Sequence, residues 1–168
     1  TVMMLSRFLE KPGEPMVKLC KRLLRYLKGT RTLGLRYSKS NTVLLGGLFK
    51  TTANDFVCGF SDADWAGEPD KRQSTEGMIL MVAGAAVSWW SKLLKTIALS
   101  SQDAEYMALS DASREMLFIR ALLSSLGFII DTSSLFGDNA GSLALAENPC
   151  NHQKSKHIQV RYHFIRQK

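Results

Sequence analysis

The spacing of apolar residues near the start of the chain predicts an amphipathic helix over residues 15–28. Pro15 suits the first helical position, and Gly29 suits the residue just past the end. One face is apolar at three- and four-residue intervals: Val17, Cys20, Leu23, Leu24 and Leu27. The other side carries charge of one sign only: Lys18, Lys21, Arg22, Arg25 and Lys28. This stripe is either a solvated face or a surface that follows phosphates, and the pattern leaves both readings open.

Shorter apolar runs follow and predict strands. Leu33–Tyr37 and Thr42–Phe49 are expected to form a hairpin around a turn at Ser40-Asn41. Five more strands are expected in the main part of the chain: Phe56–Ser61, Met78–Val82, Val87–Ser91, Lys95–Leu99 and Ser134–Gly137. The stretch Trp65–Thr75 is rich in glycine, proline and charge, which predicts a loop. Trp89 and Trp90 are neighbours in one strand, so one should face the core and the other should not.

A long helix is expected over residues 102–126. Ser100 and Asp103 supply an N-terminal cap, and Gly127 suits the end. Its buried face is expected to comprise Ala104, Met107, Ala108, Ala112, Ile119, Leu122, Leu123 and Leu126. A short helix over Ala140–Ala146 and another around Ile158–Gln167 follow the last strand. Antiparallel strands, then a helix, a strand and a helix are typical of an α/β layer fold with a mixed sheet.

Composition fits a globular domain with a polyanionic partner. The 168 residues suffice for one domain of ordinary size plus a short appendage, and 45% of them are hydrophobic. The formal net charge of +7 favours nucleic acid first and an anionic membrane second, although the charge can also serve solubility alone. No run reaches the ~18 apolar residues that a membrane span needs, and no signal peptide is visible.

Three acids stand at positions where chemistry is often placed. Asp62 ends the first strand of the main domain, Glu105 lies in the first turn of the long helix, and Asp138 ends the later strand. Sites in open α/β sheets form at the carboxyl ends of strands, so these acids converge if the two strands are neighbours. Three hard oxygen ligands suit magnesium or manganese. Two such ions ~4 Å apart can hold the attacking water and the leaving oxygen of a phosphodiester.

Each acid also has an ordinary structural explanation. Asp62 and its neighbour Asp64 can be turn formers. Glu105 can simply complement the helix dipole, and Asp138 can be the N-cap of the short helix. Spacing alone does not decide between these roles and a metal centre.

Six segments, in chain order, resemble motifs of copia-type LTR retrotransposon Pol polyproteins. The first, Leu23–Thr30, resembles the end of their reverse transcriptase. The other five resemble their ribonuclease H domain: Gly59–Gly67; Ser88-Trp89 with Lys92; Leu99–Ser101 with Ala104–Leu109; Asp138–Ala140 with Asn148-Pro149; and Lys156–Ile158 with Arg161–Arg166. The resemblance covers nearly the whole chain.

The resemblance implies a ribonuclease H-like fold, a five-stranded mixed sheet with helices on both faces, preceded by a helix-hairpin connection segment. Residues 1–50 would be the tail of the reverse transcriptase and residues 51–168 the ribonuclease H-like domain. The implied activity is hydrolysis of the RNA strand of RNA–DNA hybrids during reverse transcription. Asp62, Glu105 and Asp138 would be catalytic and would bind two Mg²⁺ ions, with Mn²⁺ as an alternative.

The implied partners are the RNA–DNA hybrid and the rest of the reverse transcriptase polyprotein, with no membrane. The implied location is intracellular, in a cytoplasmic virus-like particle. Asp64 and His157 are auxiliary candidates near the metal-binding acids. The residues expected to contact nucleic acid are Lys71, Arg72, Ser74, Lys154, Lys156, Arg161 and Arg166.

One departure from the family's pattern bears on activity. Members of this family usually carry an acid directly after Lys-His-Ile, as a fourth metal ligand, and this chain has Gln159 there. Glutamine is neutral and ligates metals weakly, so one of the two ions should bind less tightly. The alternative to an active enzyme is therefore an impaired or inactive remnant that only binds nucleic acid or braces the polymerase. A milder departure is Glu76, which stands where serine is common.

Overall fold

The computed structural model describes residues 2–38, 56–67 and 72–147, and the chain divides into two compact units, Thr1–Arg36 and Tyr37–Lys168. The domain boundary expected at residue 50 lies outside the described residues. The first unit contains α1 (Val2–Ser6) and α2 (Glu14–Gly29). The predicted amphipathic helix is thus confirmed. It begins with proline in its first turn and is closed by a hydrogen bond from the Thr30 N–H to the Tyr26 carbonyl at 3.0 Å.

The predicted strand Leu33–Tyr37 is wrong, and its expected partner Thr42–Phe49 lies outside the described residues. The Leu33 N–H bonds to the Thr30 carbonyl at 2.9 Å, so the segment begins in a turn. Two hydrogen bonds connect the end of the segment to residues 83–86. The Tyr37 hydroxyl donates to the Ala86 carbonyl and the Ser38 N–H donates to the Ala83 carbonyl, both at 2.9 Å. Two isolated bonds do not make a ladder, which explains why the segment is extended without being a strand.

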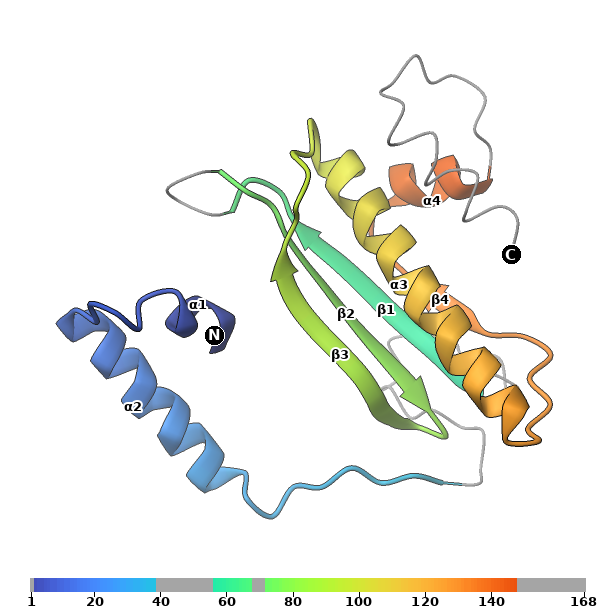
Figure 1. Cartoon of the computed structure of the whole chain (residues 1–168), viewed down its shortest axis with the longest axis horizontal. Helices are drawn as coiled ribbons and strands as arrows, with labels where there is room; N and C mark the ends of the chain where they lie inside the picture. The colour runs from blue at the N-terminus through green and yellow to red at the C-terminus, as the bar shows by residue number, and fades with distance from the viewer. Residues whose placement is uncertain (1, 39–55, 68–71, 148–168) are drawn as a thin grey trace. The chain divides into compact units, whose positions relative to one another are not determined.

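The second unit is built on a mixed sheet in which the strand order is β3-β2-β1-β4 (Figure 1). Its strands are β1 (Val57–Asp64), β2 (Thr75–Val82), β3 (Ala85–Leu93) and β4 (Ser134–Phe136). The first three are antiparallel neighbours, and β4 runs parallel to β1. The predicted α/β class with a mixed sheet is confirmed. The fifth strand and the helices expected on the second face are not found among the residues that the structure describes.

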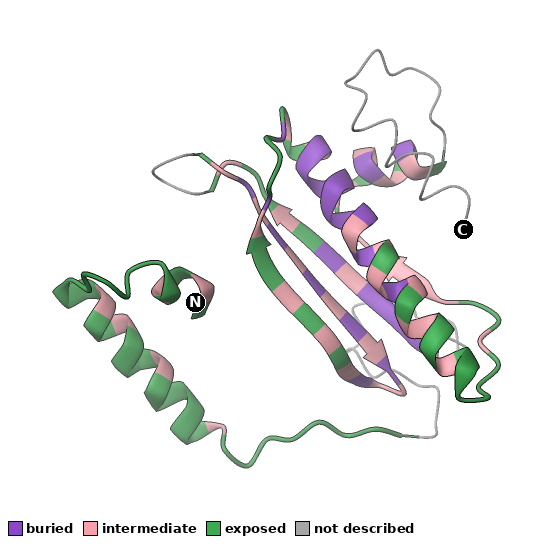
Figure 2. Cartoon of the chain, viewed as in Figure 1, coloured by how far each residue is buried: buried purple, intermediate pink, exposed green. Residues whose placement is uncertain are grey.

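One face of this sheet is covered by α3 (Ser101–Ser125), and Figure 2 shows that purple, the colour of buried residues, occurs along the strands and the first half of α3. In β2 every second residue from Glu76 to Val82 is buried, which is the period of a strand with one covered face. The core here joins the strand residues Val57, Met78, Leu80 and Val82 to Ala112 and Met116 of α3. Trp90 packs against this core while Trp89 is 65% exposed, as the alternation predicted.

The expected buried face of α3 is confirmed from Ala104 to Ala112, and Ile119 and Leu123 pack against the core as expected, but the prediction is wrong at Leu122 and Leu126. Leu122 is 46% exposed and Leu126 is 66% exposed. Leu126 is the residue just after the end of α3, and Leu122 lies about 100° around the helix from Leu123, which packs against the core. Among the described helices, none has the length and apolar character needed to cross a bilayer.

The predicted strand Lys95–Leu99 is also wrong, because β3 continues to Leu93 and pairs with β2 along its whole length. Leu93 pairs with Thr75, the first residue of β2, so no partner strand remains beyond that point. The chain instead turns toward α3. The segment after β3 is held by a hydrogen bond from the Leu94 N–H to the Ser74 carbonyl at 2.8 Å.

Gly59 in β1 is required by close packing, which gives a first prediction. A Cβ at this position would lie 2.3 Å from Leu80 Cδ2, 2.9 Å from Leu135 Cδ1 and 3.1 Å from Met116 Cε. Gly59→Ala should therefore lower the free energy of unfolding by about 1–3 kcal/mol, the usual cost of overpacking a core. Urea unfolding measures the change. Gly77→Ala is the control, because its added methyl would meet only ordinary contact at 3.7 Å, and an equal loss in both variants would contradict the packing argument.

Candidate metal centre

Three acids from distant parts of the chain meet at one edge of the sheet. Asp62 lies in β1, and Asp138 follows β4 by two residues. Because β1 and β4 are parallel, their carboxyl ends point to the same edge. Glu105 is the fifth residue of α3, which starts at this edge. One carboxylate oxygen from each of Asp62, Glu105 and Asp138 lies within 4.8 Å of the others, with Glu105 buried and both aspartates exposed.

The acids are held by their neighbours, which pack into a second core cluster. Ala63 follows Asp62 and packs against this cluster, while Ala104 and Tyr106 flank Glu105 and belong to it. Leu145 also belongs to this cluster. It lies in α4 (Ala140–Glu147), the helix that starts two residues after Asp138. A small apolar floor thus fixes the backbone under all three carboxylates and leaves the exposed aspartate oxygens facing solvent.

The structural roles that could have explained these acids are filled by other residues. Asn139 caps α4, since its Oδ1 accepts from the Ser142 N–H at 2.9 Å and its carbonyl accepts from the Ser142 hydroxyl at 2.9 Å. Ser100 caps α3 by accepting from the Asp103 N–H at 3.1 Å, as predicted. The acid in the first turn of α3 is Asp103, so Asp103 complements the helix dipole and Glu105 lies just beyond that turn. Asp62 pairs with Gly77 inside the β1–β2 ladder and forms no turn. These three acids are therefore available for another task.

Burial and like charge shift the titration of Glu105. Burial raises the pKa of Glu105 from 4.5 to about 7; a hydrogen bond from the Ala63 backbone lowers it, and the charges of Asp138 and Asp62 raise it. Like charges this close repel one another, and a cation between them relieves the repulsion. A divalent cation with oxygen preference matches this donor set, because the group that the described residues form contains carboxylates alone.

The other predicted site residues are distributed differently. Asp64 is the last residue of β1 and is exposed, but it is not one of the three clustered acids. Arg72 is exposed in the loop before β2, with a positive φ of 52°. The remaining candidates lie outside the described residues: Lys71, Lys154, Lys156, His157, Gln159, Arg161 and Arg166.

Ser74 was expected to contact nucleic acid, and the structure corrects this. Ser74 is only 4% exposed, and its hydroxyl accepts a hydrogen bond from the Ala66 N–H at 3.1 Å. A side chain with this burial supports the loop and does not present itself to a ligand. The expectation rested on its place in a polar loop, and the sequence holds no signal that separates a buried loop serine from an exposed one.

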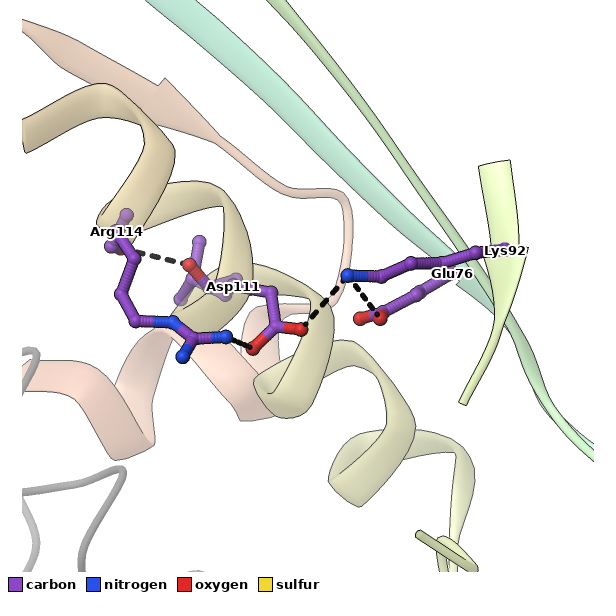
Figure 3. Close-up of polar contacts among 6 residues, drawn as sticks. Glu76, Lys92, Asp111 and Arg114 are labelled. Atoms are coloured by element: carbon purple, nitrogen blue, oxygen red, sulfur yellow. Dashed lines mark hydrogen bonds and ion pairs between the residues drawn. The ribbon is translucent and has the colours of Figure 1, made fainter. Parts of the chain in front are cut away.

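Sequence reasoning also missed an ion network on the covered face of the sheet, drawn in Figure 3. Lys92 Nζ of β3 lies 3.3 Å from Glu76 Oε1 of β2 and 3.3 Å from Asp111 Oδ2 of α3. Arg114 reaches the other oxygen of Asp111 at 2.7 Å. Burial raises the pKa of Glu76 to about 7, with a further increase from Asp111 and an opposing decrease from Lys92. The network connects two strands to α3.

Comparison with known proteins finds several relatives that are similar to this chain in sequence. No family model matches the chain. The retrovirus-related Pol polyprotein from transposon TNT 1-94 of Nicotiana tabacum is 37% identical over 162 residues, and that from transposon RE1 of Arabidopsis thaliana is 39% identical over 163 residues. Each match covers 96% of this chain, and 11% and 10% of the relative. The secreted RxLR effector protein 161 of Plasmopara viticola is 41% identical over 115 residues, which are 68% of this chain and 72% of that protein.

Two solved structures resemble the chain more distantly. RNase H1 from the halophilic archaeon Halobacterium salinarum NRC-1 has a TM-score of 0.46 and 19% identity, covering 66% of this chain and 76% of that one. LC11-RNase H1 has a TM-score of 0.47 and 14% identity, covering 66% and 71%. The family assignment depends on the sequence relatives, whose matches extend over almost the whole chain. The chain belongs to the retrovirus-related Pol polyproteins from transposons and spans about a tenth of the length of the two Pol relatives named above.

Proposed function

We propose that this chain is a metal-dependent endoribonuclease, of the ribonuclease H type, that hydrolyses the RNA strand of RNA–DNA hybrids during retrotransposon reverse transcription. The observation that carries the proposal is the meeting of Asp62, Glu105 and Asp138 within 4.8 Å at the carboxyl edge of the sheet. Membership of the Pol polyproteins supports it. The motifs that carry these acids also follow one another in the order that resembles the ribonuclease H domain of that family. The rest of the polyprotein is then the partner in the same chain.

Asp62, Glu105 and Asp138 are the residues that would hold two Mg²⁺ ions, with Mn²⁺ as an alternative. When bound, such ions activate water and stabilise the leaving oxygen of the phosphodiester. The aspartates present their oxygens at the open surface, where a scissile phosphate can approach. Glu105 stays behind them, buried and held by the Ala63 backbone, so that its carboxylate cannot swing away.

The hybrid is recognised by its phosphates and by the 2′-hydroxyls in its wide minor groove. The formal net charge of +7 favours this partner through release of counterions. Arg72 is an exposed cation in the loop that links β1 to β2, the two strands paired at the acid edge, and is the first candidate for a phosphate contact. The basic residues of the tail, Lys154, Lys156, Arg161 and Arg166, complete the proposed contacts.

A cleavage assay on an end-labelled RNA–DNA hybrid, with Mg²⁺ and then with Mn²⁺, tests the function. We expect cutting of the RNA strand that depends on the metal and spares the DNA strand. Binding of the hybrid without cleavage in either metal would favour a second candidate, a remnant that grips nucleic acid or braces the polymerase. The observation behind that candidate is Gln159, which stands where the family usually has its fourth acid.

Gln159→Asp separates the two candidates further. If a fourth carboxylate completes the site, the variant should raise the cleavage rate by about tenfold or more, because a charged ligand holds the second ion more tightly. Rates at subsaturating Mg²⁺ give the most sensitive measurement. Gln153→Asp adds the same charge elsewhere in the tail and should change little. Equal rates for both variants would show that position 159 does not contact the metals.

Protons and metal ions compete for the Glu105 carboxylate, which predicts how the affinity for a metal ion depends on pH. The pKa of about 7 means that the metal-free site holds a proton on Glu105 below neutral pH, and a metal ion must displace it. The affinity for Mn²⁺ should therefore fall by up to about tenfold when the pH drops from 7 to 6, and change little between pH 8 and 9. Calorimetric titration measures it. Glu105→Gln should bind more weakly at every pH and lose the dependence on pH in this range.

A further inference from the structure

We propose that Trp65 and Ser74 are positioning residues of the acid cluster, which hold the start of α3, and with it Glu105, against the end of β1. Neither side chain is among the three acids, and neither needs to touch a metal or a nucleic acid. The proposal rests on the function proposed above, because it gives the two residues a role in metal binding by the same site.

Trp65 connects the strand that carries Asp62 to the segment that leads into α3. It comes directly after β1, three residues beyond Asp62. Its indole Nε1–H donates to the Ala98 carbonyl at 3.0 Å. Ala98 is 7% exposed and lies two residues before Ser100, the cap of α3. The hydrogen bond thus sets the distance between the end of β1 and the start of the helix that bears Glu105.

Ser74 adds two more connections at the same edge. Its hydroxyl accepts from the Ala66 N–H at 3.1 Å, which ties down the residue after Trp65. Its carbonyl accepts from the Leu94 N–H at 2.8 Å, which ties down the first residue after β3. Ser74 is 4% exposed, and its bond with Ala66 is partly buried. The loop after β1, the start of β2 and the segment before α3 are therefore joined through one residue.

These bonds converge on the floor of the site. Leu94 and Ala98, the ends of the segment that the bonds fix, belong to the same core cluster as Ala104, which precedes Glu105. Metal ligands must be held to within roughly half an ångström of their productive geometry. A shift of the start of α3 would move the Glu105 carboxylate relative to Asp62, while all three ligands remained present. Loss of the bonds should therefore weaken metal binding without removing a ligand.

The test compares Trp65→Phe and Ser74→Ala with the wild-type full chain in a calorimetric titration with Mn²⁺. Trp65→Phe keeps an aromatic ring and removes the N–H donor, and Ser74→Ala removes the acceptor of the Ala66 bond. Each should raise the Mn²⁺ dissociation constant by about fivefold, the size expected from one hydrogen bond. Trp89→Phe is the matched control, because Trp89 is 65% exposed on β3 and should change the constant by less than about twofold.

A merely structural role would lower the urea midpoint of the two variants and leave the Mn²⁺ affinity of the folded protein as in wild type; that result overturns the proposal. Absence of any Mn²⁺ binding that depends on Asp62 in the wild type overturns the proposed function and this proposal together. Wild-type binding with unchanged variants overturns only the positioning role. The two failures are thus distinguishable.

A measurement on the wild-type protein tests the same proposal even if a variant does not fold. Coupling between the site and the Trp65 bond is reciprocal, so metal binding should strengthen the bond as much as the bond strengthens metal binding. Saturating Mg²⁺ should slow hydrogen exchange of the Trp65 indole N–H by about fivefold, as measured by NMR, and leave that of Trp89 unchanged. An unchanged Trp65 rate overturns the proposal.

Discussion

Replacing Asp62 with Asn should abolish cleavage of RNA–DNA hybrids, with a rate at least about 1,000-fold below that of the wild-type chain. Asn keeps the size and shape of the side chain but removes the charge that a divalent ion requires. Electrostatic stabilisation by bound metal ions contributes several kilocalories per mole to the barrier of phosphodiester hydrolysis, and about 4 kcal/mol corresponds to this factor. Single-turnover rates with Mg²⁺ on an end-labelled hybrid are the measurement.

Asp131→Asn is the matched control, because it makes the same chemical change on an exposed residue between α3 and β4, away from the carboxyl edge of the sheet. Its rate should stay within about twofold of wild type. Asp62→Asn should also remain folded, and even gain slightly in stability without metal, since one of three crowded charges is gone. Cleavage that survives Asp62→Asn would remove the acid cluster from the mechanism, whatever the chain's family.

The meeting of the three acids could be predicted because it depends on topology and not on detail. The apolar runs located both strands, although β1 continues two residues past Asp62 and β4 ends two residues before Asp138. A parallel pair of strands brings its carboxyl ends together, and with them these two acids. Glu105 follows the Ser100 cap at a fixed helical distance, so the cap located it as well. The sequence left open whether Asp62 formed a turn, Asp138 capped a helix and Glu105 complemented the helix dipole. Asn139 and the β1–β2 ladder resolved the first two questions, through hydrogen bonds that no spacing rule specifies.

What the sequence could not predict depends on pairing across the chain. Lys95–Leu99 has the composition of a strand, but β2 has no residues left to pair with it, and only the register shows this. Ser74 occupies a polar loop and is nonetheless buried, because two other segments close over it. Glu76 faces α3 through the same alternation that buries Met78 and Leu80, so a charged residue is placed in the core next to its partners.

Glu76 leads to the second large effect, which is on stability. Lys92→Met should lower the free energy of unfolding by about 2–3 kcal/mol at pH 8. The variant keeps an aliphatic chain over Trp90 but removes the cation that Glu76 and Asp111 share, leaving two acids whose side chains are 2% and 9% exposed. Breaking a fully buried ion pair costs roughly 3–5 kcal/mol, and the 47% exposure of Lys92 makes the expected loss smaller. Lys95→Met, on an exposed lysine, is the control.

The loss should depend on pH, with a sign that follows from Glu76. Its pKa of about 7 lies above the ordinary 4.5, so the folded protein holds a proton that the unfolded chain releases. Stability from this group is fully present below about pH 4.5 and is lost as the pH rises through 7. Lys92 lowers this pKa, so without it the decline extends to higher pH. Urea unfolding of metal-free Lys92→Met should therefore show a smaller deficit at pH 6 than at pH 8.

A double variant shows which acid is responsible. Adding Glu76→Gln to Lys92→Met removes the charge that has lost its partner, whereas Asp111 keeps Arg114 at 2.7 Å. The double variant should recover at least half of the lost stability at pH 8. Its stability should fall less between pH 6 and 8 than that of Lys92→Met, and the fall that remains belongs to Glu105. A deficit that is equal at both pH values and is not relieved by Glu76→Gln would mean that Lys92 acts by packing over Trp90 and that Glu76 does not titrate in this range. Recovery confined to pH 8 would show that β2, β3 and α3 are held together by a buried acid whose charge is tolerated only because Lys92 lies beside it.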